Sequence, residues 1–138
     1  IHNIQYTITN NFQPYAVTIS GNTISSINTL LIPSSVTYNG INYSITYIGN
    51  NAFQSCSFLT GDLIIPNSVT SIGNNAFQYC SGLTGILTIG DSVTTIGKEA
   101  FQGCFGLTRS LTIPDSVTQI CNGAFRSCSG FTGSLTIR

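Results

Sequence analysis

A repeat of 24 residues constrains the fold of this chain more than any other feature of its sequence. The units 59–82, 83–106 and 107–130 have identical residues in 12 of their 24 columns, and residues 131–138 begin a further unit. No unit can bury its apolar side chains alone, whereas stacked units place identical columns above one another at about 4.7–5 Å per coil. The repeat therefore predicts one continuous solenoid.

Each unit contains three local patterns. The sequence Leu-x-Ile, as at 63–65, alternates apolar residues at period two and predicts a short strand with one buried face. The sequence Val-Thr-x-Ile, as at 69–72, follows a turn and predicts a second short strand. The segment from Asn74 through Ala-Phe to Cys80 is compatible with one helical turn whose phenylalanine points inward. We therefore expect a mainly β repeat protein with two short strands and a short helical turn in each coil.

The chain before the regular repeats differs from them and predicts an N-terminal cap at 1–47. An insertion at 38–46 carries Asn39-Gly40 between β-rich flanks, which is a strong hairpin signal. Two earlier stretches alternate like strands, 4–9 and 16–20. We expect this hairpin cap to cover the first coil of a repeat region at 48–138, since a solenoid end otherwise exposes its core. We expect no C-terminal cap on this repeat region.

The repeated pattern L-x-I-P-x-S-V-T-x-I-G-x-x-A-F-x-x-C-x-x-L-T resembles the BspA-like (Treponema pallidum type) leucine-rich repeat over about residues 26–138. Two residues depart from that pattern, because Gly90 replaces the proline and Cys121 replaces the glycine. The resemblance implies a leucine-rich-repeat solenoid. It also implies a non-enzymatic surface or secreted protein of bacteria or protozoa, which binds host extracellular-matrix or other surface proteins.

Charged residues are scarce and balanced. They make up 6% of the chain, four Lys/Arg against four Asp/Glu, and none of these precedes Asp62. This balance argues against nucleic acid or an anionic membrane surface as a partner, because both attract a basic excess. No run approaches the roughly 20 apolar residues that cross a bilayer, so we expect no membrane insertion. Recognition has to depend on hydrogen bonds, shape and a few aliphatic side chains.

No arrangement of residues predicts catalysis, a cofactor or a metal site. His2 is the only histidine and lies in the terminal arm, so the framework supports no Ser-His or Cys-His pair. Asp91 and Asp115 share a turn column, where a side chain that accepts a nearby backbone N–H explains them. The glycine-rich segments lack the lysine of a phosphate-binding loop.

Four of the five cysteines occupy one column of the repeat: Cys56, Cys80, Cys104 and Cys128. They lack the short C-x2-C spacing of zinc sites. We expect small buried side chains with inert thiols. Stacked Cα atoms about 5 Å apart are also compatible with a Cys56–Cys80 or Cys104–Cys128 disulfide. Cys121 lies in a turn column, and we expect an alkylating reagent to reach it first.

The outward positions of the strands form the candidate protein-binding surface, because the inward columns maintain the fold while the outward ones can vary. Serine and threonine also simply suit an exposed strand, whereas Ile64 and Ile86 would be neighbouring exposed aliphatic residues. The candidates from the first strands are Asp62, Ile64, Ile86, Thr88, Ser110 and Thr112. The candidates from the second strands are Tyr47, Ser71, Thr95 and Gln119.

The favoured hypothesis is a non-enzymatic adhesion or protein-binding module, extracellular or at the cell surface, which binds host matrix or other surface proteins through its exposed strand face. An alternative is a truncated or engineered scaffold that forms a homo-oligomer through its uncapped C-terminal coil, since unpaired strand edges attract other strands. A minor alternative is an ice-binding solenoid, suggested by columns of threonine. The first strands lack the Thr-x-Thr pair that this last alternative favours.

Overall fold

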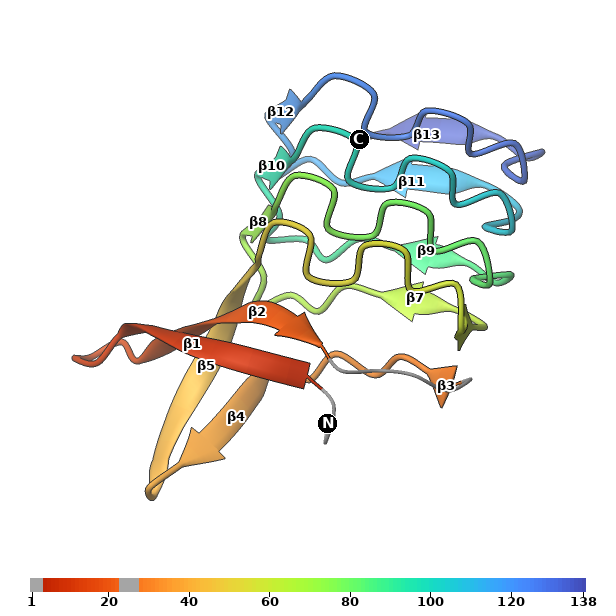
Figure 1. The fold of residues 1–138 in the computed structure, drawn as a ribbon. Coiled ribbons are helices and arrows are strands. Elements are labelled where there is room, and N and C mark those ends of the chain that lie inside the picture. The colour runs from red at the N-terminus through yellow and green to blue at the C-terminus, as the bar shows by residue number, and fades with distance from the viewer. Residues whose placement is uncertain (1–3, 23–27) are drawn as a thin grey trace.

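Stacked coils, each one repeat long, form most of the structure (Figure 1). This computed structural model describes residues 4–22 and 28–138. The described residues form a β-solenoid of about five turns, as the repeat predicts. They contain no helix with the length and apolar character needed to cross a bilayer.

Two sets of parallel strands are stacked along the axis of the solenoid, one strand of each set per coil. The second strand of each coil lies in one sheet, in which Tyr47, Ser71, Thr95 and Gln119 pair in register. Within a seven-stranded sheet, the strands that the coils contribute are β5 (Ile41–Ile48), β8 (Ser71–Ile72), β10 (Thr95–Ile96) and β12 (Gln119–Ile120). We call this set the second-strand sheet.

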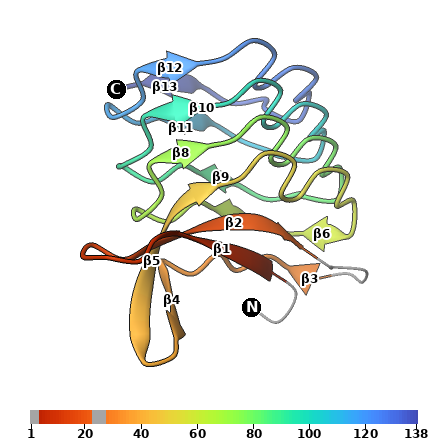
Figure 2. The same ribbon diagram turned by 60° about the vertical axis from the view of Figure 1, so that its left-hand side comes forward.

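The first strands lie on another side of the stack, and we call their outer surface the first-strand face (Figures 1 and 2). Here β7 (Leu63–Ile64) pairs with β9 (Leu87–Thr88), and β11 (Leu111–Ile113) pairs with β13 (Leu135–Ile137). A third short pair, β3 (Asn28–Thr29) with β6 (Leu59–Thr60), accompanies them. Each of these strands has only two or three residues. Packing between neighbouring coils therefore stabilises this side more than long hydrogen-bonded ladders do.

The cap consists of two hairpins joined to the second-strand sheet. Strand β1 (Ile4–Asn10) pairs antiparallel with β2 (Ala16–Asn22), β2 pairs parallel with β5, and β4 (Ser35–Tyr38) pairs antiparallel with β5. Asn39 and Gly40 have φ of 49° and 77°, as a two-residue type I′ turn requires. The predicted hairpin is therefore confirmed, and β5 continues from it into the stack of coils.

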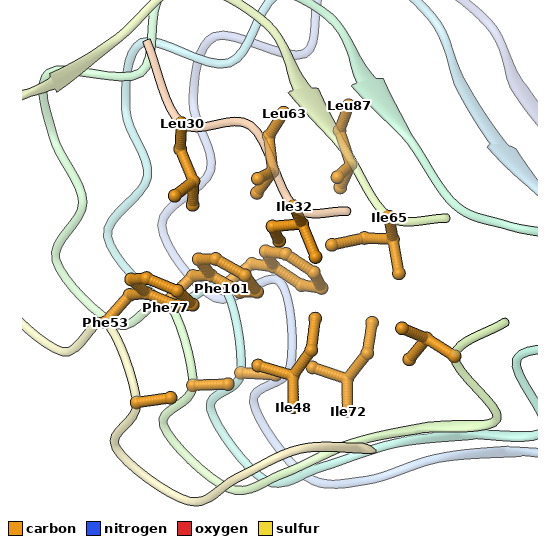
Figure 3. Close-up of a cluster of buried hydrophobic side chains, with 14 of the residues drawn as sticks. Leu30, Ile32, Ile48, Phe53, Leu63, Ile65, Ile72, Phe77, Leu87 and Phe101 are labelled. Atoms are coloured by element: carbon orange, nitrogen blue, oxygen red, sulfur yellow. The ribbon is translucent and has the colours of Figure 1, made fainter. Parts of the chain in front are cut away.

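The core is a set of ladders of identical side chains (Figure 3). The rings of Phe53 and Phe77 are stacked with centroids 5.1 Å apart, and Phe101 continues the stack at 5.4 Å. All three rings are fully buried. The leucines of the first strands and the isoleucines of the second strands point toward each other from opposite sides of the core. The two sets of strands therefore turn their outward side chains in opposite directions.

The segment before each cysteine is a run of turns and not the expected helical turn. Phe77 donates its N–H to the carbonyl of Ala100 in the next coil (2.7 Å), whereas Cys80 donates to Phe77 within its own coil (3.2 Å). Asn75 and Tyr79 have φ of 57° and 60°, outside the right-handed helical region. A helix would direct every N–H into its own backbone. Bonding between coils competes with this pattern, and the described residues contain no helix.

Candidate functional site

The first-strand face exposes several aliphatic side chains, and inside and outside positions alternate along its short strands. Leu63 and Ile65 are buried, while Ile64 between them is 55% exposed. Ile86 lies in the next coil, two residues before the Thr88 that pairs with Ile64, and is 36% exposed, so both predicted side chains are exposed. Leu31, which occupies the same column as Ile64, is 68% exposed. We call Leu31, Ile64 and Ile86 the aliphatic patch.

Leu31 is absent from the candidates chosen from the sequence, although a signal for it exists. The run Leu30-Leu31-Ile32-Pro33 aligns with Leu63-Ile64-Ile65-Pro66, which places Leu31 in the outward column. The run matches the repeat pattern, and the insertion that follows it breaks the 24-residue period without changing the column of Leu31.

A groove of about 420 Å³ runs beside the first part of the patch, between Leu31 and Ile64. Asp62 lies at its edge and is exposed. One carboxylate oxygen of Asp62 accepts the N–H of Ile86 in the next coil (2.8 Å). Asp62 therefore connects two coils as well as supplying charge to this groove.

A second groove of about 250 Å³ lies over the junction between β9 and β11. These two strands are not paired in the part of the chain that the structure describes. Pro114 contributes to the interruption, because it has no N–H to donate to the preceding coil. Four of the candidate residues line this groove: Ile86, Thr88, Ser110 and Thr112. The oxygen of Ser110 accepts the N–H of Ser134 (3.1 Å), whereas the hydroxyls of Thr88 and Thr112 have no partner within the described residues.

The candidates on the second-strand sheet do not join either groove. Tyr47, Ser71 and Thr95 are half-buried, and Gln119 is exposed. The hydroxyl of Tyr47 donates to the side-chain oxygen of Asn50 (3.0 Å), and burial raises the pKa of Tyr47 above its ordinary value. Threonines in the neighbouring column donate their hydroxyls to main-chain carbonyls one coil earlier. The donor and acceptor residues are Thr70 and Thr46, Thr94 and Thr70, and Thr118 and Thr94. The structure thus divides the ten candidates into six on the first-strand face and four on the other side.

Three members of the cysteine column are buried in the core, Cys128 is half-buried against it, and all five cysteines are free. The thiols of Cys80, Cys104 and Cys128 each donate to the carbonyl of a phenylalanine one coil earlier, at 3.0, 3.1 and 3.0 Å. Burial raises the pKa of Cys104 to about 12 and that of Cys128 to about 11. Cys121 is partly exposed, as its turn column predicts. Within residues 4–22 and 28–138, no group of three or more His, Cys, Asp or Glu side chains is arranged to hold a metal ion.

Comparison with known proteins identifies the repeat. The model of the BspA type leucine-rich repeat region matches residues 46–135 with six copies. A leucine-rich repeat protein from Bacteroides capillosus is 29% identical and has a TM-score of 0.79, with 100% of this chain and 96% of that chain covered. One from Bacteroides ovatus is 31% identical with a TM-score of 0.72, covering 97% of this chain and 40% of that chain.

A leucine-rich cell surface protein from Faecalibacterium prausnitzii has the same fold, with a TM-score of 0.72 at 24% identity. It covers 100% of this chain and 42% of that chain, so this chain spans well under half of that protein and of the Bacteroides ovatus protein. Comparison with curated proteins gives no match. The family model covers more than half of the chain, and the chain therefore belongs to the BspA-type leucine-rich repeat family.

Proposed function

We propose that this chain is an adhesion module of a cell-surface or secreted protein and that it binds host extracellular-matrix or other surface proteins through its first-strand face. Leucine-rich repeats in general form a non-enzymatic scaffold for protein–protein interaction. The similar protein from Faecalibacterium prausnitzii is described as a cell surface protein, which supports the proposed location.

The aliphatic patch is the observation that carries this proposal. Leu31, Ile64 and Ile86 are large apolar side chains exposed on three successive coils, next to two shallow grooves. Contiguous exposed apolar side chains with a polar rim are typical of protein interaction sites, because their burial in a complex is favourable. Asp62 and the threonines beside the patch supply such a rim.

The charge of this face indicates how it would bind. Asp62, Asp91 and Asp115 are exposed along it, so three of the four acidic residues of the chain lie on or beside the first-strand face, and Arg138 lies beside Asp91 and Asp115. The number of charges is small, so electrostatic steering would be weak and association slow compared with highly charged pairs. We therefore expect affinity to depend on the aliphatic side chains more than on salt concentration.

Surface plasmon resonance against a panel of purified extracellular-matrix proteins tests the proposal, with serum albumin as the non-matrix control. We expect saturable binding to at least one matrix protein, weakened about tenfold or more by Ile64→Asp, since this change puts a charge where apolar area is buried. Ile8→Asp alters an exposed isoleucine of the cap and serves as the matched control. Absence of binding to every matrix protein, or equal binding by Ile64→Asp, would contradict the proposal.

Self-association through the last coil and ice binding stay predictions of the sequence. The bonds from Thr70, Thr94 and Thr118 to the main chain occupy hydroxyl donors of one threonine column.

A further inference from the structure

Hydrogen bonding between the first strands alternates from coil to coil. Strand β7 pairs with β9, and β11 pairs with β13. Within the described residues, β9 does not pair with β11, and no main-chain hydrogen bond joins 30–32 to 62–65 in the following coil. Paired and unpaired neighbours therefore follow each other along the first-strand face, where strands β7 to β13 lie one above another (Figure 1).

Each unpaired junction coincides with one of the two grooves of this face. The groove of about 420 Å³ lies between 29–32 and 61–64, and we call it the first groove. The groove of about 250 Å³ lies between 86–91 and 110–114, and we call it the second groove. Each groove therefore marks a break in the main-chain ladder.

The second groove contains polar groups without a partner. Across the paired junction, Leu63 donates its N–H to the carbonyl of Ile86 (2.9 Å). The equivalent N–H of Leu87, at the second groove, has no partner within the described residues. The hydroxyls of Thr88 and Thr112 in the same groove also have none in that part of the chain. A bound segment with free acceptors would therefore satisfy donors that the fold leaves unpaired.

The two grooves lie in the same columns of the repeat, two coils apart. Residues 62 and 64 at the first groove occupy the same columns as 110 and 112 at the second. Stacked strands are about 4.8 Å apart, so the centres of the grooves are separated by about 10 Å. The stacked core rings give a similar spacing for each coil, 5.1 and 5.4 Å. The paired strands β7 and β9 form the ridge between the grooves.

A ligand chain that lies along the solenoid axis can enter both grooves only if its own repeat matches this spacing. In the polyproline II conformation, side chains three residues apart point the same way and are about 9.3 Å apart. Side chains on one face of an extended strand recur at about 6.6–6.8 Å, which is too short. An α-helix, with a pitch of about 5.4 Å, places an additional side chain over the ridge. The spacing therefore favours polyproline II.

The chemistry of the grooves also fits such a segment. Leu31 and Ile64 are exposed at the first groove, and Ile86 is exposed at the second, so aliphatic side chains of a ligand would bury apolar area in both. A polyproline II chain has no internal hydrogen bonds, so its carbonyls are free to accept from the hydroxyls of Thr88 and Thr112. The carbonyls of an α-helix are already bonded within the helix.

We propose that the first-strand face binds a proline-rich segment of a partner protein in the polyproline II conformation. The segment lies across the coils and places aliphatic side chains three residues apart in the first and second grooves. Proline-rich segments are preformed in this conformation, which reduces the entropy lost on binding. This inference rests on the proposed function, because it names the kind of segment that the same face binds.

Titration of the full 138-residue chain with three synthetic peptides tests the spacing. The peptides have the same composition, a proline background and two leucines, which are two, three or four residues apart. We expect calorimetry to show that the peptide with the three-residue spacing binds at least about tenfold more tightly than the other two. Equal affinities for the three peptides, or no binding by any of them, would overturn the proposal.

Two substitutions change the grooves while keeping residues that the repeat already contains. Ile64→Thr introduces the residue found at Thr88 in the same column, and Ile86→Ser introduces the residue found at Ser110. Each should reduce the preference for the three-residue spacing to about threefold or less, because one leucine loses apolar contact. Ile8→Thr alters an exposed isoleucine of the cap and should leave the preference intact. Circular dichroism checks that the variants fold, and an unchanged preference in either groove variant would contradict the proposal.

Two further probes represent other occupants of this face. They are an α-helical peptide with leucines seven residues apart and a triple-helical collagen-like peptide. If either binds more tightly than the proline-rich peptide with the three-residue spacing, that shape is the occupant and the proposal is wrong.

Failure of this inference and failure of the proposed function give different results. Binding to a matrix protein that Ile64→Asp weakens, without any preference among the peptides, would support the proposed function and overturn this inference. Preference for the three-residue spacing, without binding to any matrix protein, would support this inference and contradict the proposed matrix partner.

Discussion

The rings of Phe77 and Phe101 lie parallel to within 2°, with their centroids 5.4 Å apart. This spacing is close to the roughly 4.7–5 Å that separates neighbouring strands of stacked coils, so each ring packs directly on the ring of the next repeat. Phe53 and Phe125 extend the stack in both directions at nearly the same spacing. The repeat period thus sets the packing of the core, and each ring stabilises the contact between two neighbouring coils.

We expect Phe77→Ala to lower the free energy of unfolding by about 3–5 kcal/mol, the usual cost of emptying a buried aromatic site. Phe77 is fully buried with a ring on each side, whereas Phe125 is only half-buried. Phe125→Ala should therefore cost distinctly less and serves as the matched control. Urea denaturation followed by circular dichroism measures both. Equal losses in the two variants would contradict a core that is packed most tightly in the middle coils.

Glutamine side chains form a second ladder between coils. The amide of Gln54 donates to Gln78 (2.6 Å), and the amide of Gln78 donates to Gln102 (2.6 Å) and to Glu99 (3.1 Å). Gln78 is only 6% exposed, so its partners in a Gln78→Leu variant would lose hydrogen bonds that water cannot fully replace. Gln78→Leu should therefore cost about 1–3 kcal/mol in urea denaturation.

Substitution Gln78→Glu gives a pH-dependent test of the same ladder. The new carboxylate would face the oxygens of Gln102 and Glu99, which disfavours its charged form and raises its pKa in the folded state. A raised folded pKa means that the unfolded protein loses this proton first as pH rises. The variant should therefore be near normal stability at pH 4 and lose stability toward pH 7, with Gln54→Glu as the comparison at the end of the ladder. A constant deficit across this range would contradict the assigned contacts.

Local sequence patterns predicted the structural features that depend only on residues close together in the chain. Asn39-Gly40 specifies its turn through its own φ values, and the spacing of Leu63 and Ile65 specifies which residues of a short strand face inward. The column of Phe77 could be recognised as core because a period of 24 residues repeats the same environment. These features need no knowledge of distant contacts.

Features that depend on contacts between coils could not be predicted. The segment with Asn75 and Tyr79 is compatible with a helical turn, but its N–H groups bond alternately to the next coil, and the positive φ values follow from that competition. The division of the candidate residues between two sides of the core depends on how far the turns rotate the chain.

The cysteine ladder predicts a loss of stability in alkaline solution. Burial raises the pKa of Cys104 from 9.0 to about 12 and that of Cys128 to about 11, so both thiols stay neutral in the folded protein at pH 10. In the unfolded chain they ionise near pH 9, which favours unfolding. The contribution of the two neutral thiols to the free energy of unfolding should be fully present below pH 9. The free energy of unfolding should then fall as pH rises toward 11–12, by up to about 1.4 kcal/mol per pH unit for each thiol.

Urea denaturation under reducing conditions at pH 7, 9, 10 and 11 measures this loss. Cys104→Ser keeps a hydroxyl that can donate to the carbonyl of Phe77 but does not ionise in this range. Its stability should therefore decline less steeply with pH than that of the unmodified chain. A decline of the same steepness in Cys104→Ser would show that other groups cause the alkaline loss.

The reactivity of the five thiols should follow their position in the coils. Cys121 lies in a turn column and is partly exposed, whereas Cys80 and Cys104 are fully buried and bonded to main-chain carbonyls. Because the thiolate is the nucleophile, a buried thiol with a raised pKa reacts slowly even when a reagent reaches it. Iodoacetamide at pH 8 should therefore label Cys121 first and Cys80 and Cys104 last, as peptide mass spectrometry of timed samples would show. In urea all five should react at similar rates, and early labelling of Cys80 in the folded protein would mean that the coils open more readily than their packing indicates.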